Sequence, residues 1–337
     1  MNKKYNAVLF ILRGQPVHNA HYSIIQRASM LAEKVIIIIG SAKKPRTYKN
    51  PFTFEERASM IDPTLFIADV SIDYNIDTIY NDTAWASRIQ AVVGKYTNPG
   101  DKIAIIGHEK DSSSFYLKMF PQWKRENVEL IEPLHATDIR SLYFKKDANM
   151  NFIKNVVPRA TFDFLTKFKD TPAFNQTIQE REFIAQYRKQ YESLPYPPIF
   201  VTADSVVICS GHVLMIKRKA NPGKGLWALP GGFVNAASDK SVQDTAIREL
   251  REETGIKVPA PVLIGNIQGN KVFDAIDRSE RGRTITHAFK ITLNDTELPK
   301  VKGSDDAERA MWVPIADVKS EECFEDHFEL LSWSIGG

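Results

Sequence analysis

Two histidines stand three residues apart in the stretch "RGQPVHNAHYSIIQRA", which covers residues 13–28. Pro16 prevents a helix from continuing upstream, and a helical apolar pattern starts at Ile24, so His18 and His21 are predicted to lie at a helix N-terminus. Free backbone N–H groups and the positive end of the helix dipole favour an anion there. The ring N–H groups add further donors, so this segment predicts a phosphate-binding site.

Two other interpretations of the histidine pair stay open. In the first, one histidine caps the helix while the other packs against a sheet. The second is a zinc site, which is weaker because no third or fourth ligand is in view. Two further loops favour phosphate: "GSAKKPRTYKNPFTFEERASMI" (40–61) is basic, and "PLHATDIR" (133–140) offers a hydroxyl and a cation. A solvated charge run could explain any one loop but hardly all three. The added residues are Lys43, Lys44, Arg46, Lys49, Thr137 and Arg140.

A second chemical pattern is the acidic stretch "AIRELREETGI" at residues 246–256. Glu249, Glu252 and Glu253 are spaced so that their carboxylates share one face of a helix. Hard oxygen ligands grouped in this way suit Mg²⁺ or Mn²⁺. The alternative is a solvated acidic face, and the "LPGGFV" before the helix and Gly255 behind it count against that alternative.

The elements that position the first set of residues alternate between strands and helices. Apolar, β-branched runs at residues 7–12, 34–40 and 102–107 predict strands buried on both faces, with helices at 21–33 and 54–61 between them. This order predicts an α/β fold with a doubly wound parallel sheet. Ligands bind outside the carboxyl ends of such strands, which is where the histidine and basic loops fall.

The pattern changes in the second half of the chain. A charged amphipathic helix, "TIQEREFIAQYRKQYESL", ends at "PYPP" (195–198), and short strands with one strong helix at 241–254 follow. We therefore predict three parts: a domain over residues 1–170, a helical linker over 171–198, and an α+β domain with a mixed sheet over 199–337.

Composition excludes several functional classes. The 337 residues carry a formal net charge of only +3, which argues against a nucleic-acid partner or a membrane surface as the main target. Two cysteines form no disulfide framework, the short apolar start lacks a cleavage site, and no run approaches a membrane helix. We expect a cytoplasmic protein; a homo-oligomer is possible, and the sequence leaves the oligomeric state open.

Residues 13–21 resemble the nucleotidylyltransferase signature G-R-F-Q-P-x-H-x-G-H, and "ATDIR" resembles the second phosphate motif of that superfamily, S-x-T-x-x-R. "SAKKPRTYKNPFTFEER" and "GHEKDSSSFYLKMFPQW" are similar to archaeal-type nicotinamide mononucleotide (NMN) adenylyltransferases. The similarity covers about residues 5–165 and implies a Rossmann-like fold. Leu12, Gly14 and Ala20 depart from the signature, and Ala20 places a methyl group near the expected triphosphate.

This resemblance implies transfer of an adenylyl group from ATP to NMN, giving NAD and pyrophosphate. It implies that His18, His21 and Arg140 act on the ATP phosphates, helped by Arg13, Lys49 and Thr137, with Mg²⁺. It further implies that Trp85 stacks on the nicotinamide ring with Asp82 nearby, although Trp85 could equally be a core aromatic. Nicotinic acid mononucleotide is the alternative substrate.

The acidic helix resembles the Nudix box, G-x5-E-x7-R-E-U-x-E-E-x-G-U, where U is apolar. The stretch between Gly232 and Arg248 is two residues too long, and Lys240 stands where the first Glu would align. We expect this departure to loosen the loop and to leave Arg248 poorly paired. The matching residues are Gly232, Arg248, Glu249, Leu250, Glu252, Glu253, Gly255 and Ile256.

"LWALPGGFV" and "DRSERGRTITHAF" resemble Nudix hydrolases that act on ADP-ribose. The resemblance implies metal-dependent hydrolysis of ADP-ribose to AMP and ribose 5-phosphate, with Glu249, Glu252 and Glu253 as metal ligands. It places Trp227 or a nearby aromatic residue against adenine and Arg278, Arg281 or Arg283 against the diphosphate. The base is Glu253 or one of Asp305, Asp306 and Glu308. The alternative is a module that senses ADP-ribose or NAD without hydrolysis.

Overall fold

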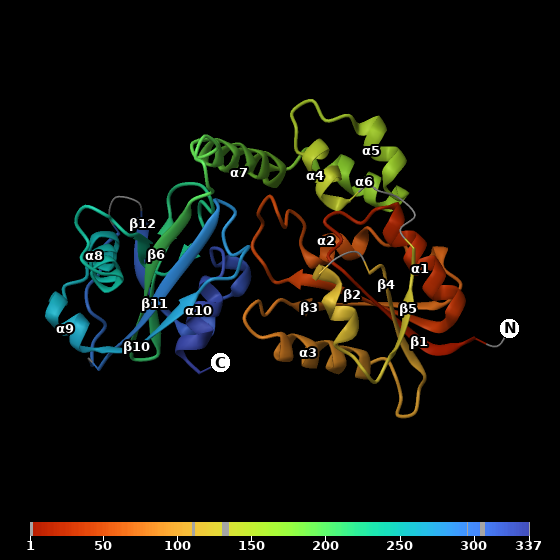
Figure 1. Cartoon of the computed structure of the whole chain (residues 1–337), viewed down its shortest axis with the longest axis horizontal. Coiled ribbons are helices and arrows are strands. Elements are labelled where there is room, and N and C mark those ends of the chain that lie inside the picture. The colour runs from red at the N-terminus through yellow and green to blue at the C-terminus, as the bar shows by residue number, and fades with distance from the viewer. Residues whose placement is uncertain (1–2, 110–111, 130–134, 295, 304–306, 337) are drawn as a thin grey trace. The chain divides into compact units, whose positions relative to one another are not determined.

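The computed structural model describes residues 3–109, 112–129, 135–294, 296–303 and 307–336. The chain forms two compact units, residues 1–178 and 179–337 (Figure 1). The division falls inside helix α7 (Pro172–Lys189), within the stretch that the sequence analysis assigned to a linker. Within the described residues, no helix combines the length and the apolar character that crossing a membrane requires.

The first unit is built on a five-stranded parallel sheet in the order β3-β2-β1-β4-β5, so the predicted doubly wound α/β fold is confirmed (Figure 1). Three of the strands were predicted, and the two edge strands β3 and β5 were missed. The strands are β1 (Tyr5–Leu12), β2 (Ala32–Ala42), β3 (Asp69–Ile76), β4 (Ile103–Gly107) and β5 (Lys124–Asn127).

Successive residues of β1 point to opposite faces of this sheet and enter two separate cores. Val8 and Phe10 pack with residues of α1, α4 and α6, whereas Leu9 and Ile11 pack with residues of α3. Both faces are therefore covered, which explains why the strand sequence is apolar throughout rather than alternating. The helices are α1 (Asn19–Leu31), α2 (Phe54–Ser59), α3 (Asp82–Gly94), α4 (Ala136–Tyr143), α5 (Met150–Val156) and α6 (Arg159–Phe168), with 3-10 turns η1 (Pro63–Leu65) and η2 (Ser112–Lys118).

The second unit contains a mixed seven-stranded sheet, as predicted. Its main path is β10-β11-β6-β7-β12, in which β6 and β11 are parallel and the other pairs are antiparallel; β8 pairs with β7 and β9 with β6. The strands are β6 (Ile199–Cys209), β7 (His212–Arg218), β8 (Trp227–Ala228), β9 (Gly231–Phe233), β10 (Ile267–Phe273), β11 (Arg283–Leu293) and β12 (Ala307–Pro314).

Helix α8 (Val242–Thr254) begins at the cap Ser241, whose side chain accepts a hydrogen bond from the Asp244 amide, and ends at Gly255 with φ 54°. Ile247 and Leu250 bury its apolar face against the sheet. Helix α10 (His327–Ser334) lies on the other side of that sheet in Figure 1. The remaining elements are α9 (Ala260–Gly265) and the 3-10 turns η3 (Ile315–Asp317) and η4 (Ser320–Glu322).

Candidate active sites

His18 and His21 lie where β1 leads into α1, as predicted. His18 is the N-cap residue of α1, and its backbone N–H donates to Nδ1 of His21 at 3.2 Å. The two rings lie 3.7 Å apart between centroids, and the ring of His21 is 6.2 Å from that of Phe10 in β1. This arrangement, with one histidine capping the helix and the other packed beside the sheet, is the alternative that the sequence analysis left open. The phosphate role therefore stays a prediction.

Burial sets the protonation of this pair. Burial first, and then the nearby His135, lowers the pKa of His18 from 6.5 to about 4. Burial and the neighbouring His18 also hold the pKa of His21 well below its usual range. Both rings are therefore neutral at pH 7, where each can donate one N–H to an oxygen but carries no charge.

Arg140 reaches the same loop from α4. Its Nη1 donates to the backbone oxygen of Gln15 at 2.6 Å and its Nη2 to Oγ1 of Thr137 at 3.1 Å. The guanidinium is buried. The contact joins residues 125 positions apart, so the structure brings Arg140 and Thr137 to the loop that precedes His18.

A residue that the sequence analysis missed, Arg57 of α2, ties the strand-end loops together. Its side chain is 1 % exposed, and its Nη1 donates to the backbone oxygens of Arg13 and Gly40, each at 2.6 Å. Its Nη2 donates to the oxygen of Ser41 at 3.1 Å, and its Nε donates to the oxygen of Thr53 at 3.1 Å. Burial first, and the nearby Arg13 next, lowers the pKa of Arg57 to about 10.

The basic residues of the strand-end loops fall into two groups. The exposed Arg13 donates from Nη2 to Oδ1 of Asn50 at 2.7 Å, which places it beside the chain neighbour Lys49. Arg46 instead forms a two-point ion pair with Glu56, both contacts at 2.7 Å. The structure therefore gives Arg46 a role in holding the loop, whereas Arg13 is exposed and Lys49 is half-buried.

Trp85 and Asp82 lie in α3. Trp85 is half-buried against the core, with its ring 6.2 Å from Tyr116 and 6.3 Å from Phe120 between centroids. Asp82 is exposed in the first turn of the helix. These contacts are those of a core aromatic, so stacking of Trp85 on a substrate ring remains a prediction.

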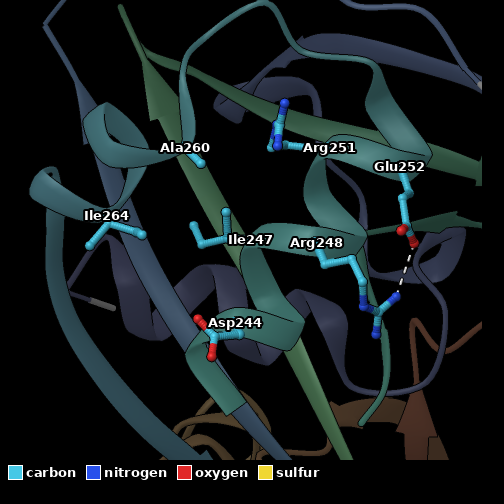
Figure 2. A pocket seen from close by; sticks show the side chains of 7 residues that line it. All are labelled: Asp244, Ile247, Arg248, Arg251, Glu252, Ala260 and Ile264. Carbon is cyan, nitrogen blue, oxygen red and sulfur yellow. Dashed lines mark hydrogen bonds and ion pairs between the residues drawn. The ribbon is translucent and has the colours of Figure 1, made fainter. Parts of the chain in front are cut away.

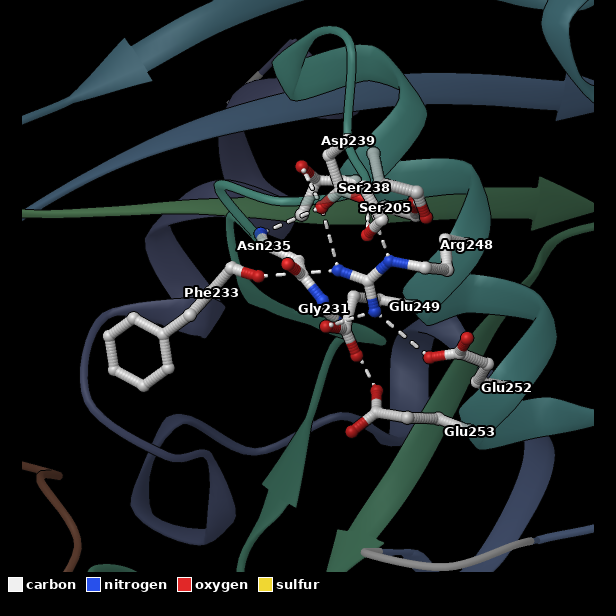
Figure 3. Close-up of polar contacts among 12 residues, drawn as sticks. Ser205, Gly231, Phe233, Asn235, Ser238, Asp239, Arg248, Glu249, Glu252 and Glu253 are labelled. Atoms are coloured by element: carbon white, nitrogen blue, oxygen red, sulfur yellow. Dashed lines mark hydrogen bonds and ion pairs between the residues drawn. The ribbon is translucent and has the colours of Figure 1, made fainter.

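In the second unit, Arg248 is the centre of a dense polar network (Figure 3). Its Nε and Nη2 donate to the two carboxylate oxygens of Asp239 at 2.9 and 2.8 Å, and its Nη1 donates to Glu249 and Glu252 at 2.8 and 2.9 Å. The expectation that Lys240 would leave Arg248 poorly paired is wrong. Because the loop is longer than the family pattern, the acid that braces it comes one residue earlier, from Asp239.

Glu253 and Glu249 lie against two glycines of the preceding strand. Glu253 Oε2 accepts a hydrogen bond from the Gly231 amide at 2.9 Å (Figure 3), and a Cβ on Gly232 would lie 2.5 Å from the carboxyl carbon of Glu249. Burial chiefly raises the pKa of Glu253 to about 8, and Glu249 and Asp204 raise it further. Burial also raises the pKa of Glu249.

Carboxylates that oppose one another's ionisation fit a divalent cation, whose charge would offset both burial and repulsion. The side chains are turned toward Arg248 and Gly231, however, and in the described part of the chain no three His, Cys, Asp or Glu side chains are grouped as a ready metal site. Asp305 and Asp306 lie outside the described residues, as does the side chain of Glu308.

The predicted substrate-binding residues of this unit take different places. Arg278 is buried in a two-point ion pair with Asp326, at 2.9 and 2.6 Å, so it supports the fold around it. Arg283, at the start of β11, donates to the backbone oxygen of Asp274 at 2.6 Å. Trp227 is half-buried in β8, with Nζ of Lys217 5.7 Å from its ring centroid.

A cavity of about 490 Å³ adjoins α8 and α9 (Figure 2). It touches the carboxylate helix from the side of Arg248 and Glu252, and Glu253 does not line it. It is bounded by Asp244, Ile247, Arg248, Arg251, Glu252, Ala260 and Ile264.

A solved structure from Francisella tularensis, a bifunctional NMN adenylyltransferase/ADP ribose pyrophosphatase complexed with AMP and a Mn ion, is 34% identical to this chain. The match covers 98% of both chains with a TM-score of 0.91. The chain belongs to this bifunctional family. The family profile "Cytidylyltransferase-like" matches residues 14–155 and "NUDIX domain" matches residues 200–334.

Two curated relatives each match a part of this chain. The nicotinamide/nicotinic acid mononucleotide adenylyltransferase of Acinetobacter baylyi is 36% identical over 180 residues, which are 52% of this chain and 94% of that protein. The ADP-ribose pyrophosphatase of Methanocaldococcus jannaschii is 36% identical over 122 residues, which are 36% of this chain and 64% of that protein.

Three residues of this family member were missed from sequence, each for a different reason. His135 stands in the quoted "PLHATDIR", but only the fold brings it near His18. Arg57 was treated as part of a helical pattern, and its carbonyl partners lie in loops 16 to 44 residues away. Asp239 was passed over because the family spacing pointed to Lys240, one residue later.

Proposed function

We propose that the first unit transfers the adenylyl group of ATP to NMN, giving NAD and pyrophosphate, and that the second hydrolyses ADP-ribose to AMP and ribose 5-phosphate. Membership of the bifunctional family supports both halves. The single observation that carries the transferase is the contact of Arg140 with the loop before His18, at the carboxyl end of β1. The imidazoles of His18 and His21 and the guanidinium of Arg140, which come from distant segments, therefore lie at the same end of the sheet.

In the transfer, a phosphate oxygen of NMN attacks the α-phosphorus of ATP and pyrophosphate leaves. The protein's work in such a reaction is positioning and charge stabilisation. Neutral His18 and His21 donate ring N–H groups to phosphate oxygens, while Arg13, Lys49 and Arg140 supply positive charge and Thr137 orients Arg140. Mg²⁺ on the triphosphate would lower its charge. Trp85 and Asp82 would hold the pyridine nucleotide.

In the hydrolysis, Glu249, Glu252 and Glu253 would hold Mg²⁺ or Mn²⁺, which lowers the pKa of water when bound. Arg248, braced by Asp239, keeps two of these carboxylates in place. Glu253, whose carboxylate accepts a hydrogen bond from the Gly231 amide beside the other two carboxylates, is our preferred base. Trp227 would stack on adenine, and Arg283 would lie near the diphosphate. Arg278 would support this site through its buried ion pair with Asp326.

The test is an assay of the full chain on ATP plus NMN, followed by NAD formation, and on ADP-ribose plus Mg²⁺, followed by AMP release. Turnover with both substrates is the expected result, and no NAD at saturating ATP would remove the transferase proposal. Parallel assays with NMN and nicotinic acid mononucleotide decide between the two pyridine substrates. Tight ADP-ribose binding without AMP release would favour the sensing alternative.

We also infer that the protein works in the cytoplasm without a nucleic-acid or membrane partner. The small net charge supports this, because it gives the chain little overall attraction to a polyanion. A homo-oligomer is compatible with it.

A further inference from the structure

A cavity of about 670 Å³ lies in the first unit where three neighbouring parallel strands, β1, β4 and β5, begin. His18 follows the opposite end of β1, and a strand of 8 residues is roughly 25 Å long. The cavity is therefore separate from the proposed transferase site. It is bounded by Lys4, Tyr5, Asp101, Lys102, Ile103, Gln122, Lys124, Arg125 and Glu126.

The two acids at this cavity already have partners within the protein. Oε1 of Glu126 accepts hydrogen bonds from Nζ of Lys4 and from the hydroxyl of Tyr5, both at 2.5 Å. The carboxylate of Asp101 accepts a hydrogen bond from the backbone N–H of Asn98 at 2.8 Å, which closes the turn before β4. Neither acid is thus paired with the remaining cations of the cavity.

Those cations are Lys102, Lys124 and Arg125, which are all exposed. Among the residues that the structure describes, none forms an ion pair or a side-chain hydrogen bond with any of the three. Glu109, on which the charge of Arg125 acts, is paired with Lys118. Three positive charges without counter-ions therefore surround one hollow.

The backbone that carries these cations is fixed. The N–H of Lys102 donates to Oδ1 of Asn6 at 2.9 Å, and its carbonyl oxygen accepts from the N–H of Asn6 at 2.9 Å. Lys124 and Arg125 are held by the pairing of β5 with β4. Basic side chains also keep other strands from pairing with a sheet edge. That role would explain Lys124 and Arg125, but not Lys102, which precedes the inner strand β4.

We propose that this cavity binds a small anion with two or more phosphate groups, held by Lys102, Lys124 and Arg125. A planar guanidinium and two ammonium groups match phosphate oxygens, and a bound anion would remove the repulsion among the three cations. The volume lies within the range of about 300–1,000 Å³ that is usual for small-molecule sites. The proposal does not depend on either proposed activity.

The test is a titration of the full chain with inorganic tripolyphosphate without Mg²⁺, followed by hydrogen exchange in residues 98–105 and 122–127. This readout is local, so binding near His18 does not stand in for binding here. Exchange should slow in wild type. The concentration for half of the effect should rise about tenfold in Arg125→Gln and in Lys102→Gln, as for loss of one charged hydrogen-bond donor.

Lys167→Gln removes an exposed charge from α6 of the same unit and is the matched control, with the concentration for half of the effect unchanged. Thermal unfolding of all variants without the anion should coincide with that of wild type. No slowing of exchange in wild type overturns the proposal. Equal concentrations for wild type, Arg125→Gln and Lys102→Gln overturn it as well, because these residues would then serve only the sheet.

Two further anions define the ligand class. Single inorganic phosphate should act only at much higher concentration than tripolyphosphate, and equal potency would overturn the requirement for two or more phosphate groups. ATP carries the same chain of phosphates on a nucleoside. ATP acting at a lower concentration than tripolyphosphate would assign the cavity to nucleotides, and the opposite order would assign it to inorganic polyphosphate.

Discussion

At the scale of single residues, the role that we propose for His18 in catalysis comes with a cost in stability. Its pKa of about 4 means that the ring is neutral at pH 7 and that the net charge facing a triphosphate must come from the arginines and lysines. A buried neutral imidazole offers a directed N–H donor whose orientation is fixed before the substrate arrives. Such preorganised donors stabilise charge that develops in a transition state.

We expect His18→Ala to slow NAD formation by at least about a hundredfold, as for removal of one preorganised donor. Steady-state rates with saturating ATP and NMN measure this, and ADP-ribose hydrolysis by the same sample should be unchanged. An unaltered NAD rate would mean that His18 only caps α1.

The same histidine predicts how stability depends on pH. Because folding lowers its pKa from 6.5 to about 4, the unfolded chain binds more protons between these values, and stability falls as the pH drops through this window. From pH 7 to 5 the loss is about 2 kcal/mol. Chemical unfolding of the full chain at both pH values measures it, and His18→Asn should lose less on acidification. An equal loss in both proteins would contradict the assignment to His18.

Asp239 shows how a spacing rule can point to the wrong position. Its carboxylate holds Arg248 by two hydrogen bonds, so Asp239→Asn should weaken the brace and reduce AMP release from ADP-ribose by about tenfold or more. Lys240→Ala is the matched control, since this neighbour is exposed, and it should behave as wild type. Reduced AMP release in Lys240→Ala but not in Asp239→Asn would instead support the alignment that puts the bracing residue at position 240.

At the scale of elements, α8 works because the strand before it can approach closely. A methyl group at residue 232 would sit 2.5 Å from the carboxyl group of Glu249, so Gly232→Ala should displace that side chain, abolish most ADP-ribose hydrolysis and lower the thermal stability of this unit. Gly265→Ala in α9 meets no atom within 4 Å and should leave both unchanged. AMP release and thermal unfolding of both variants provide the measurement.

The central elements could be predicted from the sequence and the edges could not. Strands β1, β2 and β4 are buried on both faces and therefore form continuous apolar runs. Strand β5 has the sequence "KREN", which contains no apolar residue, and its pairing with β4 is set by the fold. The same limit holds for the sites: the motifs pointed to His18 and Glu253 as candidates, whereas the places of Arg57 and His135 depend on contacts across long stretches of chain.

At the scale of the whole molecule, α7 contributes to both units. Phe174 and Ile178 pack into the core of the first unit. Further along, Glu180 accepts a hydrogen bond from the Gly223 amide at 3.1 Å, and the rings of Tyr187 and Tyr191 lie 5.9 and 5.1 Å from that of Phe200. The second unit therefore includes residues that the predicted boundary at 199 leaves out.

A fragment of residues 179–337 should consequently melt at a higher temperature than one of residues 199–337, because the shorter fragment exposes the Phe200 ring and leaves the Gly223 amide without Glu180. Thermal unfolding followed by circular dichroism compares them. Equal melting temperatures would show that α7 adds nothing to the second unit.

The shared helix also restricts how this gene can change. Each added or deleted residue turns the rest of an α-helix by about 100°, so a single-codon insertion between Phe174 and Ile178 would turn one of these two side chains away from the core of the first unit. Insertions or deletions of seven residues, close to two whole turns, nearly preserve which side of the helix each side chain lies on. Natural variation in this part of the chain is therefore expected to accumulate as substitutions or as whole-turn steps, and only rarely as single-residue gaps.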